Sequence, residues 1–553
     1  MTEPGTDPAI RDVLTEHAGS GERAVGVHVH GAALVDAARA VLDELLADGV
    51  PAALASKDAT LWGPEATPEA TVRLGWLDAV DTGRDVVPTV LALREELTAE
   101  GVDRVVLCGM GGSSLAPEVV CATAGADLVV LDSTDPAQVR AALAVDDADL
   151  LQRTVVVVSS KSGGTVETDS QRRAARTAFE AAGIDPARRV VVVTDPGSPL
   201  AEQSEHEGVR ALFLADPDVG GRYSALTAFG LVPAGLAAVD IGALLDEAAE
   251  VRSSLEQGGP ALLLGALLGA AAAGGRDKLV LTPSGELPGF GDWAEQLVAE
   301  STGKAGRGIL PVVVESADAP GTEPAGDALV VALGDPPDGP GATVRGPLGG
   351  QFLVWEYATA VAGRVLGINP FDQPNVQESK DNTGAILGGR RPPVAEPLVT
   401  EDGLEVYATG DLLSGVTDLT GALDALLAAV PERGYLAVMA YLDRGGEPQA
   451  ADLRRLLAAR LAHPVTFGWG PRFLHSTGQY HKGGPQTGAF LQVTAAVERD
   501  LDVPGRDYTF GQLQAAQAMG DLRALGERDR PVLRVHLTDR RAGLERLLQV
   551  ARA

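Results

Sequence analysis

The sequence has very little cysteine and few aromatic side chains. Only two of the 553 residues are cysteines, Cys108 and Cys121, and aromatic residues make up 4% of the chain. Two cysteines cannot build a framework of disulfides, which fits a reducing compartment. We therefore expect a cytoplasmic protein.

Long apolar runs are also lacking. The most apolar stretch, residues 261–275, is too short and too rich in glycine for a membrane span, and we interpret it as a buried core helix. Residues 1–17 are acidic and contain no apolar core, so they do not predict a signal peptide. No membrane partner is expected.

Basic residues are scarce relative to acidic ones. Lys and Arg number 45 against 76 Asp and Glu, a formal net charge of −31. Such a surface repels phosphate backbones, so nucleic acid is not expected as a partner. An anionic substrate would have to be drawn in by a local positive site. The 45% hydrophobic and 22% charged residues are typical of a globular protein, and the length allows two or three domains.

The pattern of apolar residues predicts an α/β protein. Residues 1–100 are mainly amphipathic and predict an N-terminal helical segment. Short valine-rich runs then alternate with helical segments, which favours parallel sheets covered on both faces. We expect a first α/β domain over residues 101–245. A second α/β domain, ending in a helical tail, is expected over residues 246–553.

Two loops at predicted strand ends have the composition of anion sites. They are GMGGSSLAP at residues 109–117 and SSKSGGTVET at residues 159–168. Small residues and hydroxyls before a helix N-terminus leave backbone N–H groups free to bind an anion. Tight turns without a ligand are the alternative. A second alternative is a partial dinucleotide-binding fingerprint, in which Asp132 at the end of the next strand would bind the ribose. The third glycine of that fingerprint is missing.

Four further positions could carry acid–base or anion chemistry. A predicted helix places Gln296 and Glu300 four residues apart on one face, which makes Glu300 a candidate general base. Arg222 follows two glycines, Lys380 ends a long loop segment, and His475 lies in a turn. Each could instead have only a structural role. The spacing of the histidines matches no zinc motif, so no metal is implied.

Taken together, these segments resemble the phosphoglucose isomerase family. The resemblance rests on GMGGSS, SSKSGGTVET, GGRYSALTAFGLVP, EQLVAESTGK and GINPFDQPNVQESK, and on HSTGQYHKGGP nearer the C-terminus. Together with KDATLWGP near the start, the sequences of these motifs are most similar to the isomerase portion of bacterial transaldolase–isomerase fusions. Nothing in the first hundred residues predicts the (β/α)8 barrel of the fusion partner.

The resemblance implies two sugar-isomerase (SIS) type α/β domains, a possible homodimer, a sugar phosphate substrate and no cofactor. It also implies residue roles. The catalytic residues would be Glu300 as the base, Arg222 as the cation that stabilises an enediolate, Lys380, and His475 for ring opening; the substrate-binding residues would be Gly112, Ser113, Ser160, Ser162, Thr165 and Gln296.

The implied activity is the reversible conversion of D-glucose 6-phosphate to D-fructose 6-phosphate through a cis-enediol(ate), in glycolysis and gluconeogenesis. The alternatives are a dual phosphoglucose/phosphomannose isomerase, a non-catalytic phosphosugar-binding regulator, and a dinucleotide-dependent enzyme. Glu300 argues against the regulator, because mere binding needs no carboxylate beside the C1–C2 edge of a sugar.

The order of the motifs departs from the family. In the common bacterial pattern the histidine segment lies between the glutamate and the NPFDQP segment. Here residues 301–370 contain no histidine, and HSTGQ comes only after NPFDQP. The site would therefore be assembled from a rearranged chain order. In many family members this histidine comes from the partner subunit, so His475 could act in either subunit.

Overall fold

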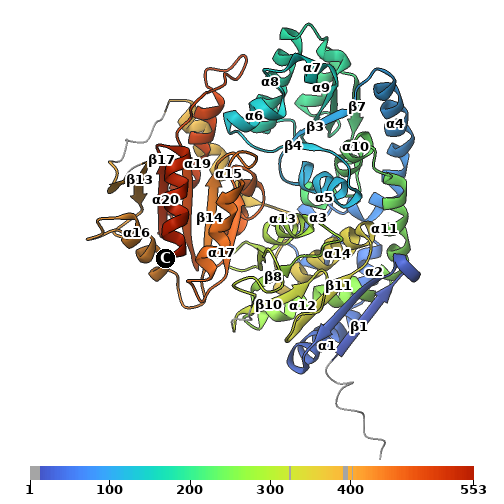
Figure 1. The fold of residues 1–553 in the computed structure, drawn as a ribbon. Helices are drawn as coiled ribbons and strands as arrows, with labels where there is room; N and C mark the ends of the chain where they lie inside the picture. Colours follow the sequence, from blue (N-terminus) through green and yellow to red (C-terminus); the bar gives the residue numbers. More distant parts are fainter. Residues whose placement is uncertain (1–12, 323–325, 390–395, 402) are drawn as a thin grey trace, which may run out of the picture.

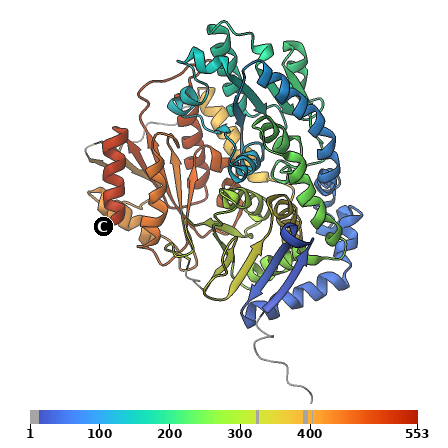
Figure 2. The ribbon, with the colours of Figure 1, turned by 45° about the vertical axis from the view of Figure 1, so that its right-hand side comes forward.

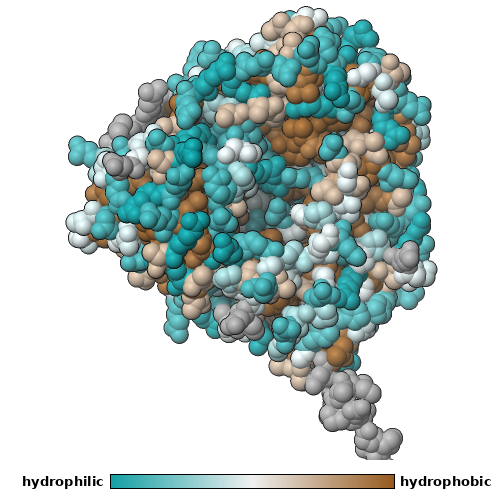
Figure 3. All heavy atoms as spheres, viewed as in Figure 1, coloured by the Kyte–Doolittle hydropathy of each residue, from teal (hydrophilic) through white to brown (hydrophobic). Residues whose placement is uncertain are grey.

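The protein has three lobes, each built around one β-sheet (Figure 1). The computed structural model describes residues 13–322, 326–389, 396–401 and 403–553. The first lobe lies at the top of Figure 1, the second at the lower right and the third at the left. Hydrophilic residues cover most of this face, in keeping with the acidic composition (Figure 3).

The first lobe contains a five-stranded sheet in which every strand is parallel to its neighbours. Its order is β4 (Val129–Leu131), β3 (Arg104–Gly109), β5 (Thr154–Ser159), β6 (Val190–Thr194) and β7 (Ala211–Leu214). Runs of valine make β5 and β6 buried throughout, because branched side chains pack well on a sheet covered on both faces. The strand order reverses beside β3. The loops after β3 and β5 therefore lie side by side at the carboxyl edge of the sheet, where ligands bind in open α/β sheets.

Helices cover both faces of this sheet. One face packs against α4 (Ala79–Ala99), α5 (Leu115–Ala124) and α10 (Ala228–Leu236). The other packs against α6 (Pro136–Ala142), α7 (Ala148–Gln152), α8 (Val166–Ala181) and α9 (Pro199–Glu207).

The second lobe has a mixed six-stranded sheet. Its order is β1 (Val13–Ala18), β2 (Val25–His30), β11 (Gly341–Arg345), β10 (Ala328–Ala332), β8 (Lys278–Thr282) and β9 (Leu310–Val313). The hairpin β1–β2 pairs antiparallel to β11, and the other four strands are parallel. Figure 2 shows this hairpin in blue beside the green and yellow strands. The helices of this lobe are α1 (Ala32–Ala47), α2 (Val50–Ala55), α3 (Thr67–Ala70), α11 (Ile241–Leu255), α12 (Gly259–Ala273), α13 (Phe290–Thr302) and α14 (Leu348–Leu366).

The third lobe has a six-stranded sheet of its own. Its order is β12 (Val399–Glu401), β13 (Leu404–Ala408), β17 (Val532–Leu537), β16 (Gly488–Ala495), β14 (Tyr435–Tyr441) and β15 (Val465–Trp469), with β17, β16, β14 and β15 parallel. One face packs against α16 (Leu419–Ala428), α17 (Asp452–Ala458) and α20 (Arg540–Arg552). On the other side are α15 (Pro374–Leu387), α18 (Gly478–Gly483) and α19 (Phe510–Gly526).

Apolar cores connect the lobes to one another. Tyr435 and Met439 of β14 share one buried cluster with Leu310 and Val330 of the second sheet. Another cluster joins one face of the first sheet to the helices of the second lobe. The three lobes are therefore packed as one body.

The structure confirms an α/β fold with parallel sheets and corrects some of its details. The described part of the first hundred residues is mainly helical, but its first elements are the strands of the hairpin β1–β2. Strands of residues 246–553 divide between the second and third sheets. Apolar periodicity indicates that a segment is a strand, but it does not indicate which strand it pairs with. The proposed domain boundaries themselves stay predictions.

Most of the apolar stretch at residues 261–275 lies in the buried helix α12, as expected. Within the described ranges, no single helix is long and apolar enough to cross a membrane, and α11 with α12 passes that test only as a pair bent by 74°.

We expect Gly265→Ala to destabilise the fold, because α12 and α14 approach closely at this glycine. An added Cβ would lie 2.6 Å from Cβ of Val361 and 2.8 Å from the carbonyl oxygen of Ala358. Overpacking of this kind costs about 1–3 kcal/mol. Thermal unfolding should show a lower Tm. As a control, Gly384→Ala in α15 meets nothing within 4 Å, so its Tm should stay the same or rise. Equal shifts in the two variants would contradict the packing argument.

Candidate active site

The loop after β3 is held tightly against a loop that carries Arg222. The loop forms a short 3-10 helix, Gly111–Ser113, and Ser113 is buried. A Cβ at Gly112 would lie 1.9 Å from the carbonyl oxygen of Gly221. Only glycine fits at this position, and the contact places the predicted anion loop beside Arg222.

The loop after β5 presents hydroxyls at the start of α8. Ser160 Oγ donates to Thr165 Oγ1 at 3.2 Å, and Ser162 Oγ accepts from the backbone N–H of Gly164 at 3.3 Å. Thr165 is the N-cap of α8. The nearby Lys161 ammonium is already engaged, because it lies 2.6 Å from a carboxylate oxygen of Asp195. Neutral donors and the helix end therefore provide most of the anion-binding capacity of this loop.

Arg222 is a buried cation at the junction of the first and second lobes. It is 3% exposed and lies in the 3-10 helix Gly221–Tyr223. Its Nη1 lies 2.9 Å from Oε1 of Glu300, and its Nε donates to Ser301 Oγ at 2.8 Å. The segment NPFDQP supplies three further acceptors to Arg222: the side chain of Gln373 and two backbone carbonyls.

The same loop holds a second buried cation, Lys304. Its Nζ donates to the carbonyl of Asn369 at 2.7 Å and to a carboxylate oxygen of Asp372 at 2.7 Å. Burial, together with the charge of Arg222, lowers the pKa of Lys304 to about 8. The NPFDQP segment therefore has a structural reason for its fixed shape, since its carbonyls solvate two cations.

Gln296 and Glu300 share one face of α13, as the spacing predicted. Gln296 Nε2 donates to Oε2 of Glu300 at 3.1 Å and to the backbone carbonyl of His475 at 2.9 Å. Gln296 Oε1 is buried and has no hydrogen-bond partner among the described residues. The site thus contains a carboxylate next to a guanidinium and a free amide oxygen.

His475 enters the site from the third lobe of the same chain. It ends the 3-10 helix Arg472–His475, which follows β15. Its Nε2 lies 2.9 Å from Oε1 of Glu167, a buried residue in the first turn of α8. Sequence reasoning missed Glu167, although it lies within SSKSGGTVET. A carboxylate in a helix first turn is common for reasons of helix stability alone.

The described residues bring together Gly112, Ser113, Arg222, Gln296, Glu300 and His475, and Glu167 connects this group to the loop of Ser160, Ser162 and Thr165. The backbone of Lys380 lies in α15, but its side chain is outside the described residues, so its role stays a prediction. Among the described residues, no group of three or more His, Cys, Asp or Glu could hold a metal ion.

Asp132 is the candidate residue for binding the ribose of a dinucleotide, but in the structure its side chain pairs with an arginine. Its carboxylate lies 2.9 Å from Nη1 of Arg472, which also contacts Glu118 at 2.7 Å. The carboxylate therefore helps to hold the third lobe against the first.

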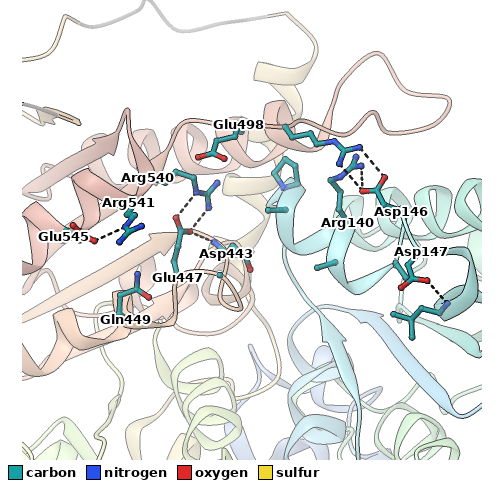
Figure 4. Close-up of a pocket in the computed structure, with 18 residues that line it drawn as sticks. Arg140, Asp146, Asp147, Asp443, Glu447, Gln449, Glu498, Arg540, Arg541 and Glu545 are labelled. Carbon is teal, nitrogen blue, oxygen red and sulfur yellow. Dashed lines mark hydrogen bonds and ion pairs between the residues drawn. The ribbon is translucent and has the colours of Figure 1, made fainter.

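A groove of about 980 Å³ between α6 and the start of α20 lies away from this group of residues (Figure 4). Its arginines point toward carboxylates. Arg140 contacts Asp146, and Arg540 contacts Glu447. These cations are engaged in pairs within the protein, and we do not assign the groove a ligand.

Comparison with known proteins places part of the candidate site inside a recognised domain. Residues 91–310 match the phosphoglucose isomerase family. That range includes Arg222, Gln296, Glu300 and both predicted anion loops, and it ends before Lys380 and His475.

Similar proteins carry the name that the sequence motifs suggest. A probable glucose-6-phosphate isomerase of Haloarcula marismortui is 36% identical over 216 residues, covering 38% of this chain and 49% of that protein. A glucose-6-phosphate isomerase of Acaryochloris marina is 37% identical over 218 residues, covering 37% and 41%. The chain thus matches about half or less of the length of these relatives. The predicted resemblance to glucose-6-phosphate isomerases is confirmed, and that to the fusion proteins stays a prediction.

The fold also resembles a solved structure. A hypothetical protein from Thermus thermophilus matches with a TM-score of 0.56 and 23% identity, covering 68% of this chain and all of that one. This likeness concerns the fold alone.

We expect Gly112→Ala to lower the Tm by several degrees, because the new methyl group would collide with the Gly221 carbonyl. The matched control is Gly221→Ala, on the other side of the same contact, where an added Cβ meets nothing within 4 Å. Differential scanning calorimetry of both variants checks this. A Tm for Gly112→Ala equal to that of the control would show that the two loops are not held as described.

Proposed function

We propose that the protein interconverts D-glucose 6-phosphate and D-fructose 6-phosphate. The observation that carries the proposal is the contact of Glu300 with Arg222 and Gln296 next to two anion loops, within the region that matches phosphoglucose isomerases. A binding protein needs the loops, but it does not need a carboxylate in this position. The motifs alone do not select between glucose and mannose 6-phosphate, which is a matter for the pocket side chains.

The anion loops would bind the phosphate. The Gly111–Ser113 loop and the loop with Ser160, Ser162 and Thr165 open at the same sheet edge. Contacts to the phosphate, which does not react, would position the reacting carbons, so that binding energy contributes to the rate.

Glu300 would act as the base that carries a proton between C2 and C1. The ion pair with Arg222 would hold the Glu300 carboxylate in place, and once Glu300 has taken the proton, the guanidinium charge would face the negative charge that develops on the sugar oxygen. Arg222 would stabilise the enediolate oxygen in this way. The free Oε1 of Gln296 could accept a hydrogen bond from a sugar hydroxyl.

His475 would open the sugar ring by exchanging a proton with the ring oxygen or with the hydroxyl of the hemiacetal carbon. His475 lies in the same chain as Glu300, and its backbone carbonyl accepts from Gln296 of α13. We propose that one subunit contains the whole acid–base set described here. A homodimer and a cytoplasmic location remain part of the proposal.

The test is turnover of fructose 6-phosphate, coupled to glucose-6-phosphate dehydrogenase, for the wild type and for Glu300→Gln. We expect kcat of the variant to fall by about a thousandfold, because the amide cannot accept the proton. Binding of 6-phosphogluconate should be retained, since it depends on the loops.

Glu295→Gln is the matched control on the same helix. Burial raises the pKa of Glu295 well above its usual range, and the amide of glutamine has nearly the same size and shape as the glutamate side chain. Its kcat should stay within about twofold of the wild type. An inactive wild type that still binds 6-phosphogluconate would indicate a phosphosugar sensor, and full activity of Glu300→Gln would contradict the assigned base.

A further inference from the structure

A buried glutamine of the third lobe connects the first lobe to the candidate active site. Gln517 lies in α19 and is 3% exposed. Its Nε2 donates to Oε1 of Glu167 at 2.7 Å, and its Oε1 accepts from Thr134 Oγ1 at 2.8 Å. Thr134 is fully buried. Both contacts are therefore made away from solvent, where an unsatisfied polar group is costly.

The carboxylate of Glu167 determines which way the amide of Gln517 faces. An ionised carboxylate has only acceptor atoms, so the group that contacts it must be the NH2 end of the amide. The reverse orientation would place two oxygens against each other. The amide oxygen is then left for the hydroxyl of Thr134, whose rotating proton can meet it.

The same oxygen of Glu167 also lies 2.9 Å from Nε2 of His475. Because that oxygen accepts from Gln517, the carboxylate is held in one place, and the imidazole nitrogen that faces it must carry a proton. A neutral His475 then has its proton on Nε2, and Nδ1 is the nitrogen that can take up a proton. A hydrogen-bonded partner of this kind often fixes the tautomer and the ring orientation of a functional histidine.

We propose that Gln517, oriented by Thr134, is a positioning residue that sets the tautomer and orientation of His475 through Glu167. Its catalytic consequence rests on the proposed function, because it assumes that His475 exchanges a proton with the sugar. The effect on the tautomer does not rest on that function. The third lobe would then contribute two residues to the site: His475 itself, and Gln517 of α19, which orients the imidazole.

The test uses the full chain labelled with 15N-histidine, with the ring nitrogens of His475 assigned by comparison with His475→Gln. In the wild type, neutral His475 should show a protonated Nε2 and an unprotonated Nδ1. In Gln517→Leu, which has similar size but no donor, the Nδ1–H form should appear in the spectrum. In turnover, kcat should fall by about tenfold, with KM within about twofold.

Two further variants separate positioning from general damage. Gln514→Leu removes a buried glutamine one turn earlier on α19, whose amide contacts Asp135 and not Glu167, so the His475 signals and kcat should be unchanged. Thr134→Val leaves Gln517 in place and should shift the tautomer in the same direction by a smaller amount. If Gln517→Leu does not fold, Thr134→Val still tests the proposal.

Unchanged His475 signals in Gln517→Leu, or in Thr134→Val if only that variant folds, would overturn the proposal. Equal effects in Gln514→Leu would do so as well. If the wild type turns over no sugar phosphate, the proposed function fails, yet the ring-nitrogen signals still decide whether Gln517 positions His475.

Discussion

The burial of the Arg222 guanidinium constrains how the first two lobes fit together. A buried charge without partners costs several kcal/mol, so each donor of this side chain must meet an acceptor. Those acceptors come from the end of α13 and from the NPFDQP segment, while Arg222 itself follows the first sheet. The guanidinium is satisfied only when both segments are in place. The carboxylate beside it therefore has a fixed position before any ligand arrives.

The third lobe is attached by a second buried guanidinium, that of Arg472. Burial alone would lower the pKa of Arg472, but the carboxylates of Asp132 and Glu118 hold it above its usual range. Arg472 begins the short helix that ends at His475. The ion pairs that attach this lobe to the first one therefore also determine where the imidazole enters the site. The order of motifs along the chain matters little to the geometry, because a segment from any position can be anchored by such a pair.

The parts of the site that could be predicted from the sequence are those formed by local chemistry. Loops of glycine and hydroxyl residues after valine-rich strands indicated the anion loops, and the spacing of Gln296 and Glu300 indicated a shared helix face. The role of Glu167 depends on a histidine 308 residues away, and that of Gln517 on contacts across two lobes. Neither has a local signature. The same holds for the third sheet, since strand pairing is decided by packing between distant segments.

Because the surface is acidic, anion binding depends more on how the donors in the site are arranged than on the net charge of the site. The chain carries a formal charge of −31, and the cations near the anion loops are largely neutralised, Lys161 by Asp195 and Arg222 by Glu300. Backbone N–H groups, hydroxyls and the N-terminus of α8 act only over short distances. An anion is thus repelled by the overall field and held by contacts that require correct placement. Such a site selects its ligand by shape and hydrogen bonding, and the buried ion pairs provide the rigidity that this selection needs.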